Sequence, residues 1–175
     1  MAETTRILVA DDEESVRDVA ARALAAPGRE IEKAQDGKTA ADLLAKSPYD
    51  LLVTDIKMPR MTGDQLVREA RKLRPDIQII MMTGFPELDT AREGIRQGVY
   101  EYLMKPFDLE DLKGAARRAL EVQRLSRENK AYQLELEARY LANVDRITTT
   151  DYLAEGYAIP LAQIFVPGKG VTALR

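Results

Sequence analysis

The chain of 175 residues contains no cysteine and no histidine. Without cysteine it forms no disulfide and carries out no thiol chemistry. Without histidine it lacks the usual general base at neutral pH, the commonest metal ligand and any phosphohistidine carrier. Any nucleophilic or metal-binding chemistry therefore rests on carboxylates, hydroxyls and amines.

The sequence also has little excess charge and no long apolar run. Its formal net charge of −3 gives no electrostatic reason to expect nucleic acid or an anionic membrane as a direct partner. No window approaches the roughly 20 apolar residues of a membrane span, and the N-terminus lacks a signal-peptide pattern. We therefore expect a soluble cytoplasmic protein. With 45% hydrophobic residues, the chain can bury one ordinary core and carry an appendage.

One apolar run, ending in a single carboxylate, organises the rest of the chain. Residues 50–59 read Asp-Leu-Leu-Val-Thr-Asp-Ile-Lys-Met-Pro. A short run of apolar and β-branched residues between turn-formers is typical of a buried strand in a parallel sheet. Asp55 is expected where this strand emerges, held on a rigid element but open toward solvent.

The N-terminal two thirds of the chain alternate strand and helix patterns. Strand patterns occur at residues 6–10, 30–34, 50–55, 77–82 and 100–104. Helical spacing of apolar residues follows the first three, a polar helix is expected at 87–97, and a last helix begins at Asp108. Five strand-helix units predict an α/β fold, a doubly wound five-stranded parallel sheet with five helices on its two faces.

Polar residues stand just beyond the ends of four of these strands. They are Asp11 and Asp12, Asp55, Thr83 and Lys105. Ligands of open α/β sheets bind outside the carboxyl ends of the strands, so these residues should converge in one shallow cleft. Each residue alone has an ordinary explanation as a cap, a turn residue or a solvated charge. Such explanations do not easily account for all four positions together.

Clustered carboxylates without a histidine suggest Mg2+, which prefers one or two carboxylates, several waters and a substrate phosphate. With the ion present all three acids can stay ionised. Asp55 is then free to attack phosphorus and form an aspartyl phosphate. Lys105 and the ion would supply positive charge, and the Thr83 hydroxyl a hydrogen bond.

At these residues the sequence resembles the receiver domain of two-component response regulators, from about Thr5 to Ala119. The matching motifs are Val-Ala-Asp-Asp-Glu, Val-Thr-Asp-Ile-Lys-Met-Pro, Met-Thr-Gly and Tyr-Leu-Met-Lys-Pro-Phe. The resemblance implies the flavodoxin-like strand order 2-1-3-4-5. Asp55 resembles the phosphoacceptor, Asp12 the direct Mg2+ ligand and Asp11 a ligand that acts through water. Lys57 would contribute its backbone carbonyl to the ion.

The resemblance also implies a switch. Thr83 resembles the hydroxyl that moves toward the phosphoryl group, and Tyr102 resembles the aromatic residue that rotates inward with it. Lys105 resembles the phosphate-binding lysine, and its bond to Pro106 resembles one that is usually cis. From the pattern alone, Tyr102 is equally well read as an ordinary half-buried strand residue.

Three classes of function are compared. The first is a signalling module that takes its phosphoryl group from a histidine kinase or a phosphotransfer protein. The second is a pseudo-receiver that binds partners without phosphorylation; the complete set of site residues argues against it. The third is a turnover enzyme such as an aspartyl-phosphate phosphatase, which would normally place its nucleophile after the first strand and carry a substrate-cap insertion. We therefore expect the chain to catalyse only its own phosphorylation and dephosphorylation.

The receiver is expected to span residues 1–120, followed by a helical extension over 121–142. The last helix should continue from Asp108 to about Leu141, because no glycine or proline interrupts it after Ala115. A possible coiled-coil seam has the alternating three-four spacing, and it consists of Val122, Leu125, Asn129, Tyr132 and Leu136. This seam predicts a parallel homodimer, formed through the last helix and the receiver face. An ordinary apolar stripe is the alternative.

Residues 143–175 are expected to form a tail whose role the sequence does not assign. Thr148-Thr149-Thr150 breaks the helical pattern, and an apolar stretch at 157–166 is interrupted by Pro160. About thirty residues without cysteine are too few to bury an independent core. The stretch packs on a partner subunit, forms an edge strand, docks another protein or remains a partly ordered tail.

Overall fold

A computed structural model describes residues 4–84 and 98–150 of the chain, with side chains described as far as residue 142. The chain divides after Ser126 into two units, residues 1–126 and 127–175, which are described separately. The predicted boundaries at residues 120 and 142 stay a prediction.

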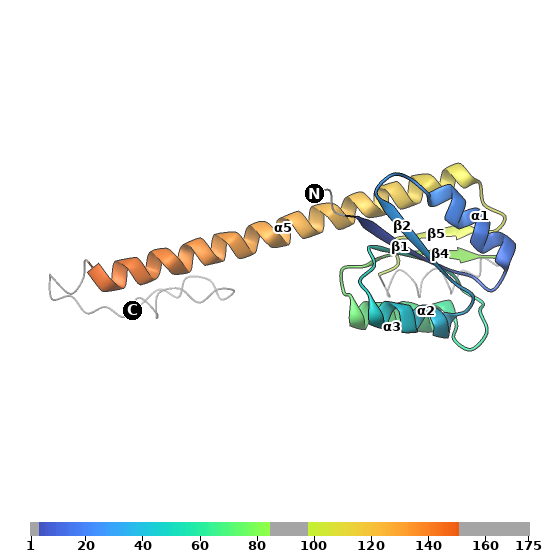
Figure 1. The fold of residues 1–175 in the computed structure, drawn as a ribbon, viewed down its shortest axis with the longest axis horizontal. Coiled ribbons are helices and arrows are strands. Elements are labelled where there is room, and N and C mark those ends of the chain that lie inside the picture. Colours follow the sequence, from blue (N-terminus) through green and yellow to red (C-terminus); the bar gives the residue numbers. More distant parts are fainter. Residues whose placement is uncertain (1–3, 85–97, 151–175) are drawn as a thin grey trace, which may run out of the picture. The chain divides into compact units, whose positions relative to one another are not determined.

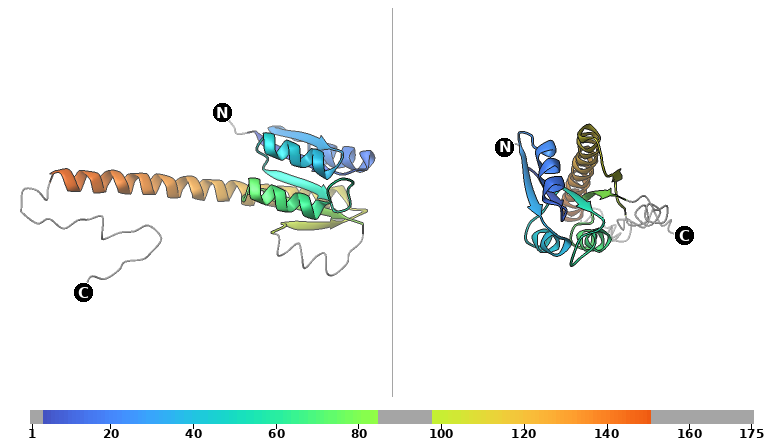
Figure 2. Two further views of the ribbon diagram at one scale, coloured as in Figure 1. Left: turned by 90° about the horizontal axis from the view of Figure 1, so that it is seen from below. Right: turned by 90° about the vertical axis from the view of Figure 1, so that its right-hand side faces the viewer.

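The first unit is built on a five-stranded parallel sheet in the order β2-β1-β3-β4-β5 (Figures 1 and 2). Its strands are β1 (Thr5–Ala10), β2 (Arg29–Ala34), β3 (Leu51–Asp55), β4 (Gln78–Thr83) and β5 (Glu101–Met104). All four strand pairs are parallel. The predicted sheet and its strand order are therefore confirmed, and β3 lies at the centre.

Helices cover both faces of this sheet. They are α1 (Glu14–Leu24), α2 (Gly37–Lys46), α3 (Gly63–Leu73) and α5 (Leu109–Thr150). The described residues thus contain four of the five predicted helices, and the helix predicted at 87–97 lies outside them. Figure 1 shows α1 and the first part of α5 on one face and α2 and α3 on the other.

The core consists of two apolar clusters, one on each face of the sheet. Leu8 and Leu52 face α2 and α3, whereas their neighbours Ile7 and Val53 face α1 and α5. Each of the five residues of β3 is buried, because helices shield the strand on both sides. The buried central strand therefore ends at Asp55.

Local sequence signals determine where the helices begin. The Asp36 side chain accepts a hydrogen bond from the Thr39 backbone N–H at the start of α2. Thr62 and Gln65 form a reciprocal capping box at the start of α3. Asp108 accepts from the Glu110 backbone N–H at 2.9 Å just before α5. Each cap satisfies backbone donors that have no partner within the helix.

Helix α5 crosses the division after Ser126 and is longer than predicted. The prediction that it ends near Leu141 is wrong, because it continues to Thr150. Threonine lowers helix propensity by only a fraction of a kcal/mol, whereas glycine and proline lower it far more. No glycine or proline occurs between Ala115 and Glu155, so nothing strong stops propagation. No helix in the described part of the chain is long and apolar enough to cross a membrane.

Candidate functional site

The parallel sheet brings the predicted site residues to one edge. Asp55 is the last residue of β3 and Thr83 the last residue of β4, while Asp11 directly follows β1 and Lys105 directly follows β5. Parallel pairing aligns the ends of neighbouring strands, and Asp55 is in register with Met82. The convergence expected from strand-end positions is therefore found for these four residues.

Lys105 holds two carboxylates of this group. Its Nζ lies 2.6 Å from Asp11 Oδ2 and 3.0 Å from Asp55 Oδ1. The remaining oxygens accept backbone hydrogen bonds, Asp11 Oδ1 from Glu13 N at 2.9 Å and Asp55 Oδ2 from Lys57 N at 3.1 Å. All four carboxylate oxygens thus face a cation or an N–H group, so both acids are held in fixed orientations.

Burial and hydrogen bonding together set the electrostatics of this cluster. Asp11 is 0% exposed and Asp55 is 7% exposed. Loss of hydration raises the pKa of Asp11 above its ordinary value, although the hydrogen bonds from Lys105 and Glu13 oppose that shift. Burial alone would lower the pKa of Lys105, but its hydrogen bonds to Asp11 and Asp55 outweigh burial and raise that pKa. Lys105 is accordingly an ammonium ion at neutral pH.

Asp12 differs from Asp11 in its exposure to solvent. It is exposed, and the described residues contain no group of three or more acidic side chains placed to hold a metal ion. Asp11, by contrast, is fully buried. The assignment of Asp12 as a direct Mg2+ ligand stays a prediction.

The residues that do converge nevertheless suit a hard divalent cation. Asp11 and Asp55 present carboxylate oxygens at one edge of the sheet, and Mg2+ needs only one or two carboxylates beside water and phosphate. The raised pKa of buried Asp11 indicates that its ionised form gains from additional positive charge. The donor chemistry therefore fits Mg2+.

The two predicted switch residues lie on β4 and β5, Thr83 at the end of β4 and Tyr102 within β5. The Lys105 backbone N–H donates to the Thr83 carbonyl oxygen at 2.6 Å, which ties the ends of β4 and β5 together. Tyr102 is half-buried against a core cluster that includes Met81, and its hydroxyl is buried with no hydrogen-bond partner in the described part of the chain. Burial, and secondly the charge of Asp64, raises the pKa of Tyr102. The Lys105–Pro106 bond is cis, as the resemblance implied.

Sequence reasoning missed the groups that orient Asp11. The Glu13 N–H binds its carboxylate, and Arg17 Nη1 donates to its backbone oxygen at 2.7 Å. Arg17 lies about one turn into the following helix α1, and only the folded start of α1 brings it back to the strand end. An arginine in the first turns after an acidic strand end is a weak signal, because arginine is common on exposed helix faces.

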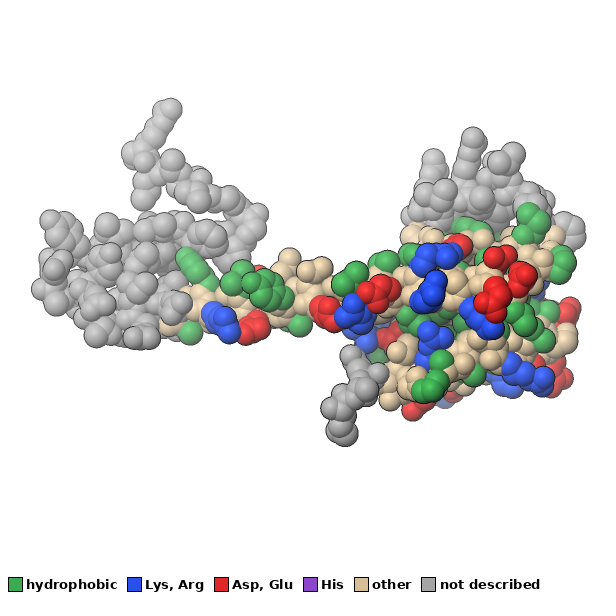
Figure 3. Space-filling model, turned by 90° about the horizontal axis from the view of Figure 1, so that it is seen from above, with side chains coloured by type: hydrophobic (Ala, Val, Ile, Leu, Met, Phe, Trp, Pro, Cys, Tyr) green, Lys and Arg blue, Asp and Glu red, His purple; other side chains and the backbone are tan. Residues whose placement is uncertain are grey.

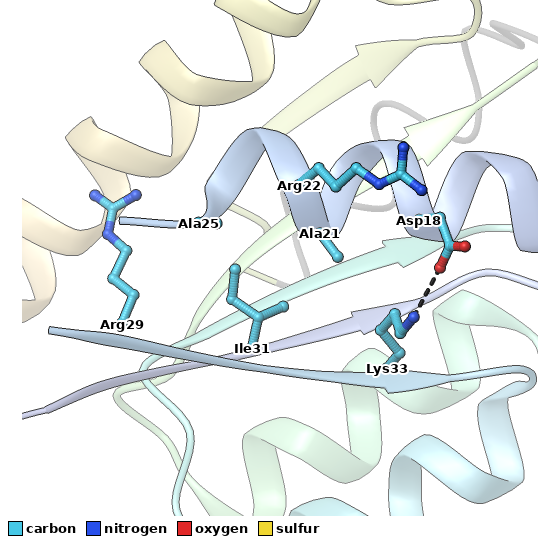
Figure 4. Close-up of a pocket in the computed structure, with 7 residues that line it drawn as sticks. All are labelled: Asp18, Ala21, Arg22, Ala25, Arg29, Ile31 and Lys33. Atoms are coloured by element: carbon cyan, nitrogen blue, oxygen red, sulfur yellow. Dashed lines mark hydrogen bonds and ion pairs between the residues drawn. The ribbon is translucent and has the colours of Figure 1, made fainter. Parts of the chain in front are cut away.

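A groove lies between α1 and β2, away from the acidic cluster (Figure 4). This groove has a volume of about 390 Å3 and includes Arg22, Arg29 and Ile31. Lys33 Nζ is paired with Asp18 Oδ1 across it at 2.7 Å. None of the four converging site residues lines the groove, so we assign it no part in chemistry at Asp55.

The sheet topology and the paired carboxylates with their lysine define a flavodoxin-like domain with a strand-end acidic site. The response regulator receiver domain model matches residues 7–117, and the chain belongs to that family. The described fold agrees with solved receivers. The signal receiver domain of an HD domain-containing protein from Pseudomonas fluorescens Pf-5 has a TM-score of 0.68 at 31% identity, covering 73% of this chain and 95% of that chain.

Several curated relatives are longer proteins. Regulatory protein AtoC of Escherichia coli strain K12 is 38% identical over 128 residues, which are 73% of this chain and 28% of AtoC. Response regulator MprA of Mycolicibacterium vanbaalenii is 38% identical over 115 residues, 66% of this chain and 50% of MprA. NtrC of Azospirillum brasilense, a DNA-binding transcriptional regulator, is 40% identical over 114 residues, 65% of this chain and 24% of NtrC. This chain thus spans half or less of these relatives, and the prediction that it uses no nucleic acid stays untested.

Proposed function

We propose that this chain is a cytoplasmic phosphorylation switch that accepts a phosphoryl group on Asp55 from a histidine kinase or a phosphotransfer protein. The single observation that carries the proposal is the contact of Lys105 with both Asp55 Oδ1 and the buried Asp11 Oδ2. A lysine between two carboxylates at a strand end provides a nucleophile, an acidic neighbour and a fixed positive charge in one place. Membership in the receiver family supports the same role.

In this reaction an Asp55 carboxylate oxygen forms a bond to phosphorus. The bond between phosphorus and the donor's imidazole nitrogen breaks, and its electron pair remains on that nitrogen. Charge accumulates on the three equatorial phosphoryl oxygens, so positive charge close to Asp55 stabilises the transition state. Lys105 supplies such charge without moving far, because its Nζ already lies 3.0 Å from Asp55 Oδ1.

Asp11 and Asp55, with the Lys57 carbonyl, would hold Mg2+ in this proposal, and Asp12 would complete the set. When bound, the ion neutralises charge shared by the carboxylates and the incoming phosphoryl group. Asp11 is suited to this role because it is buried and its orientation is fixed by Glu13 N. The Lys57 backbone is adjacent, since its N–H already donates to Asp55 Oδ2.

Phosphorylation adds roughly −1.5 to −2 charge units and three acceptor oxygens at Asp55. We propose that Lys105 then pairs with the phosphoryl oxygens and that Thr83 turns its hydroxyl toward them. Lys105 N binds Thr83 O, so movement of either residue is transmitted to the other strand. Tyr102 would become more buried in the phosphorylated state, and the surface around β5 and the start of α5 would change its partner binding or dimerisation.

The output that we propose is a parallel homodimer through α5. Gln123 is 3% exposed and pairs with Gln78, which fixes the helix against the receiver core, whereas Val122 and Leu125 remain 43% and 45% exposed. In the second unit Tyr132 and Leu136 are 66% and 56% exposed. Figure 3 shows hydrophobic side chains, in green, at the surface of this part of the helix. A second copy of the chain would remove this apolar surface from water.

Charge on the flanks of this stripe favours the parallel arrangement. One flank carries Glu121, Glu128 and Glu135 at seven-residue intervals, and the opposite flank carries the neutral Ser126 and Gln133. In a parallel pair an acidic flank meets a neutral flank, whereas an antiparallel pair would bring the acidic flanks together. Tyr140, one turn beyond Leu136 and 44% exposed, continues the apolar face past Arg139.

Intact mass spectrometry tests the proposed function. The wild-type chain, incubated with acetyl phosphate, should gain one phosphoryl group with Mg2+ and none after chelation of the metal. The Asp55→Asn variant should gain none under either condition. A wild-type chain that gains no phosphoryl group would instead favour the pseudo-receiver alternative, in which partners bind without phosphorylation.

A Lys105→Ala variant separates chemistry from switching. It removes the cation that would pair with the phosphoryl oxygens but leaves the carboxylates that would bind the metal. The variant should keep Mg2+ binding and lose the structural response of β5 to beryllofluoride, a phosphoryl mimic. Amide hydrogen exchange of residues 98–106 measures that response; a Lys105→Ala response equal to the wild type would contradict the assigned role.

A further inference from the structure

The segment between β3 and α3, residues 56–62, directly follows the acceptor and is closed into a tight loop. The Gly63 N–H donates to the Ile56 carbonyl oxygen at 2.9 Å, and Met61 N donates to Pro59 O at 2.7 Å. At its start, Lys57 N donates to Asp55 Oδ2. Any displacement of this loop therefore moves a hydrogen-bond donor of the acceptor carboxylate.

Arg60, at the far end of the loop, is held by a residue from a different part of the chain. Its guanidinium Nη2 forms an ion pair with Asp36 Oδ2 and also lies 3.4 Å from Thr39 Oγ1. Asp36 is 1% exposed, and its carboxylate also accepts hydrogen bonds from Thr39 N and Thr39 Oγ1 at 2.9 and 3.0 Å. A buried carboxylate with three donors makes a rigid anchor, because each oxygen is satisfied.

The backbone around this ion pair is unusual in two ways. Arg60 has φ of +66°, a left-handed conformation that is uncommon for residues with a Cβ atom. At Gly37, the residue after Asp36, an added Cβ would lie 2.1 Å from the Met61 carbonyl oxygen. The loop therefore contacts the start of α2 closely at Gly37 and is ion-paired with Asp36 just before that helix. These contacts hold the Arg60 backbone in a left-handed conformation that is otherwise unfavourable for a residue with a Cβ atom.

We infer that Asp36 and Arg60 form a clamp that positions the loop 56–62 for chemistry at Asp55. The clamp fixes the loop on α2, and the loop presents the Lys57 backbone to Asp55 and to the metal. Asp36 and Arg60 are positioning residues, since neither contacts Asp55. This inference rests on the proposed function. It adds that the affinity for Mg2+ depends on an ion pair that lies outside the acidic cluster.

Two substitutions remove the ion pair while preserving the local backbone. Asp36→Asn keeps an oxygen that caps α2 but removes the charge. Arg60→Gly removes the guanidinium and leaves a residue that adopts positive φ without strain. We expect each variant of the full chain to bind Mg2+ about tenfold more weakly, the low end of the effect of losing an outer partner of a metal site. The initial rate of phosphorylation by acetyl phosphate should fall by a similar factor.

Matched variants distinguish positioning from general destabilisation. Lys38→Ala removes an exposed ion pair with Asp42 on the same helix and should leave both quantities unchanged. Arg60→Lys should restore much of the lost Mg2+ affinity, because it returns a cation to Asp36. The double variant Asp36→Asn, Arg60→Gly should be no worse than either single variant, since both remove the same interaction.

Calorimetric titration with Mg2+ and amide exchange of residues 56–62 provide the readouts. Faster exchange and weaker Mg2+ binding in both single variants, but not in Lys38→Ala, would support the clamp. Mg2+ affinity and loop exchange within twofold of the wild type in both would overturn it. A wild-type chain that binds Mg2+ but gains no phosphoryl group would overturn the proposed function alone, because the titration and exchange results decide on the clamp without phosphorylation.

Discussion

Asp11 has no exposed surface and is paired with a single ammonium group. Its raised pKa means that the folded protein holds the Asp11 proton more tightly than the unfolded chain does. Raising the pH through that pKa therefore costs folding stability, because the folded state gives up its proton less readily than the unfolded chain. The cost is present at neutral pH and disappears as the pH falls below the ordinary value of 3.8.

We therefore predict that Asp11→Asn increases the free energy of unfolding at pH 7 in buffer free of divalent cations. The gain over the wild type should shrink as the pH is lowered toward 4, where Asp11 takes up its proton. Urea denaturation of both proteins at several pH values measures this difference. A variant that is less stable than the wild type at pH 7 would show that the Lys105 contact outweighs the burial of the charge.

Tyr102 allows a second test with a single atom removed. Its buried hydroxyl has no hydrogen-bond partner among the described residues, and an unsatisfied buried polar group costs about 1–3 kcal/mol. Tyr102→Phe should therefore stabilise the unphosphorylated protein by about 1 kcal/mol, measured by thermal or urea denaturation. Destabilisation by the same amount would reveal a partner for the hydroxyl and would count against the idea that this residue is free to rotate.

These single residues show how far sequence reasoning reaches. The positions of Asp11, Asp55, Thr83 and Lys105 followed from where apolar runs end, because parallel strands align their carboxyl ends. The exposure of Asp12 beside the buried Asp11 and the ion pair of Arg60 with Asp36 did not follow. They depend on side-chain directions and on contacts between segments 24 residues apart, for which a single sequence carries no spacing rule.

Among the elements, the start of α3 packs directly against the acceptor strand. An added Cβ at Gly63 would lie 2.2 Å from the Asp55 carbonyl oxygen, a backbone atom of the central strand. Gly63→Ala should cost more than about 2 kcal/mol of stability, because neither the strand nor the capping box can move aside easily. Gly63→Ala should also slow phosphorylation of Asp55. Denaturation and intact-mass kinetics on the same protein samples test both effects. A variant as stable as the wild type would contradict the close packing of Gly63 against Asp55.

Gly114 is the matched control inside a helix. Its added Cβ would meet only Arg118 Nη1 at 3.2 Å, the far end of a flexible side chain. Gly114→Ala should therefore stabilise the protein by about 0.5–1 kcal/mol through the better helix propensity of alanine. The same denaturation measurement should show a higher free energy of unfolding for Gly114→Ala and a lower one for Gly63→Ala. This difference would separate the effect of close backbone approach from the general effect of replacing glycine.

The elements themselves were predicted unevenly. The strand patterns placed all five strands to within one or two residues, because buried parallel strands are marked by short apolar runs between turn residues. The sequence predicts that α5 ends near Leu141, nine residues before its observed end at Thr150. Helix propagation responds to strong breakers, and three threonines are too weak to stop it without a glycine or proline.

For the whole molecule, the stripe on α5 predicts a dimer that sedimentation can test. Leu136 and Leu134 lie two residues apart and are 56% and 59% exposed, but only Leu136 belongs to the seam. The full chain should form a concentration-dependent dimer that beryllofluoride strengthens, and a shortened protein ending at Glu121 should dimerise less. Leu136→Lys should abolish the dimer, whereas Leu134→Lys should leave it intact; equal effects of the two would reduce the seam to an ordinary apolar stripe.

The central claim is that Asp55 alone accepts the phosphoryl group in the presence of Mg2+. Borohydride reduces an aspartyl phosphate to homoserine, so peptide mass spectrometry after treatment with acetyl phosphate and borohydride identifies the acceptor residue directly. We predict homoserine at position 55 only, present with Mg2+ and absent after chelation. Homoserine at position 11 or 12, or an unmodified Asp55 in a protein that has gained a phosphoryl group, would contradict the account.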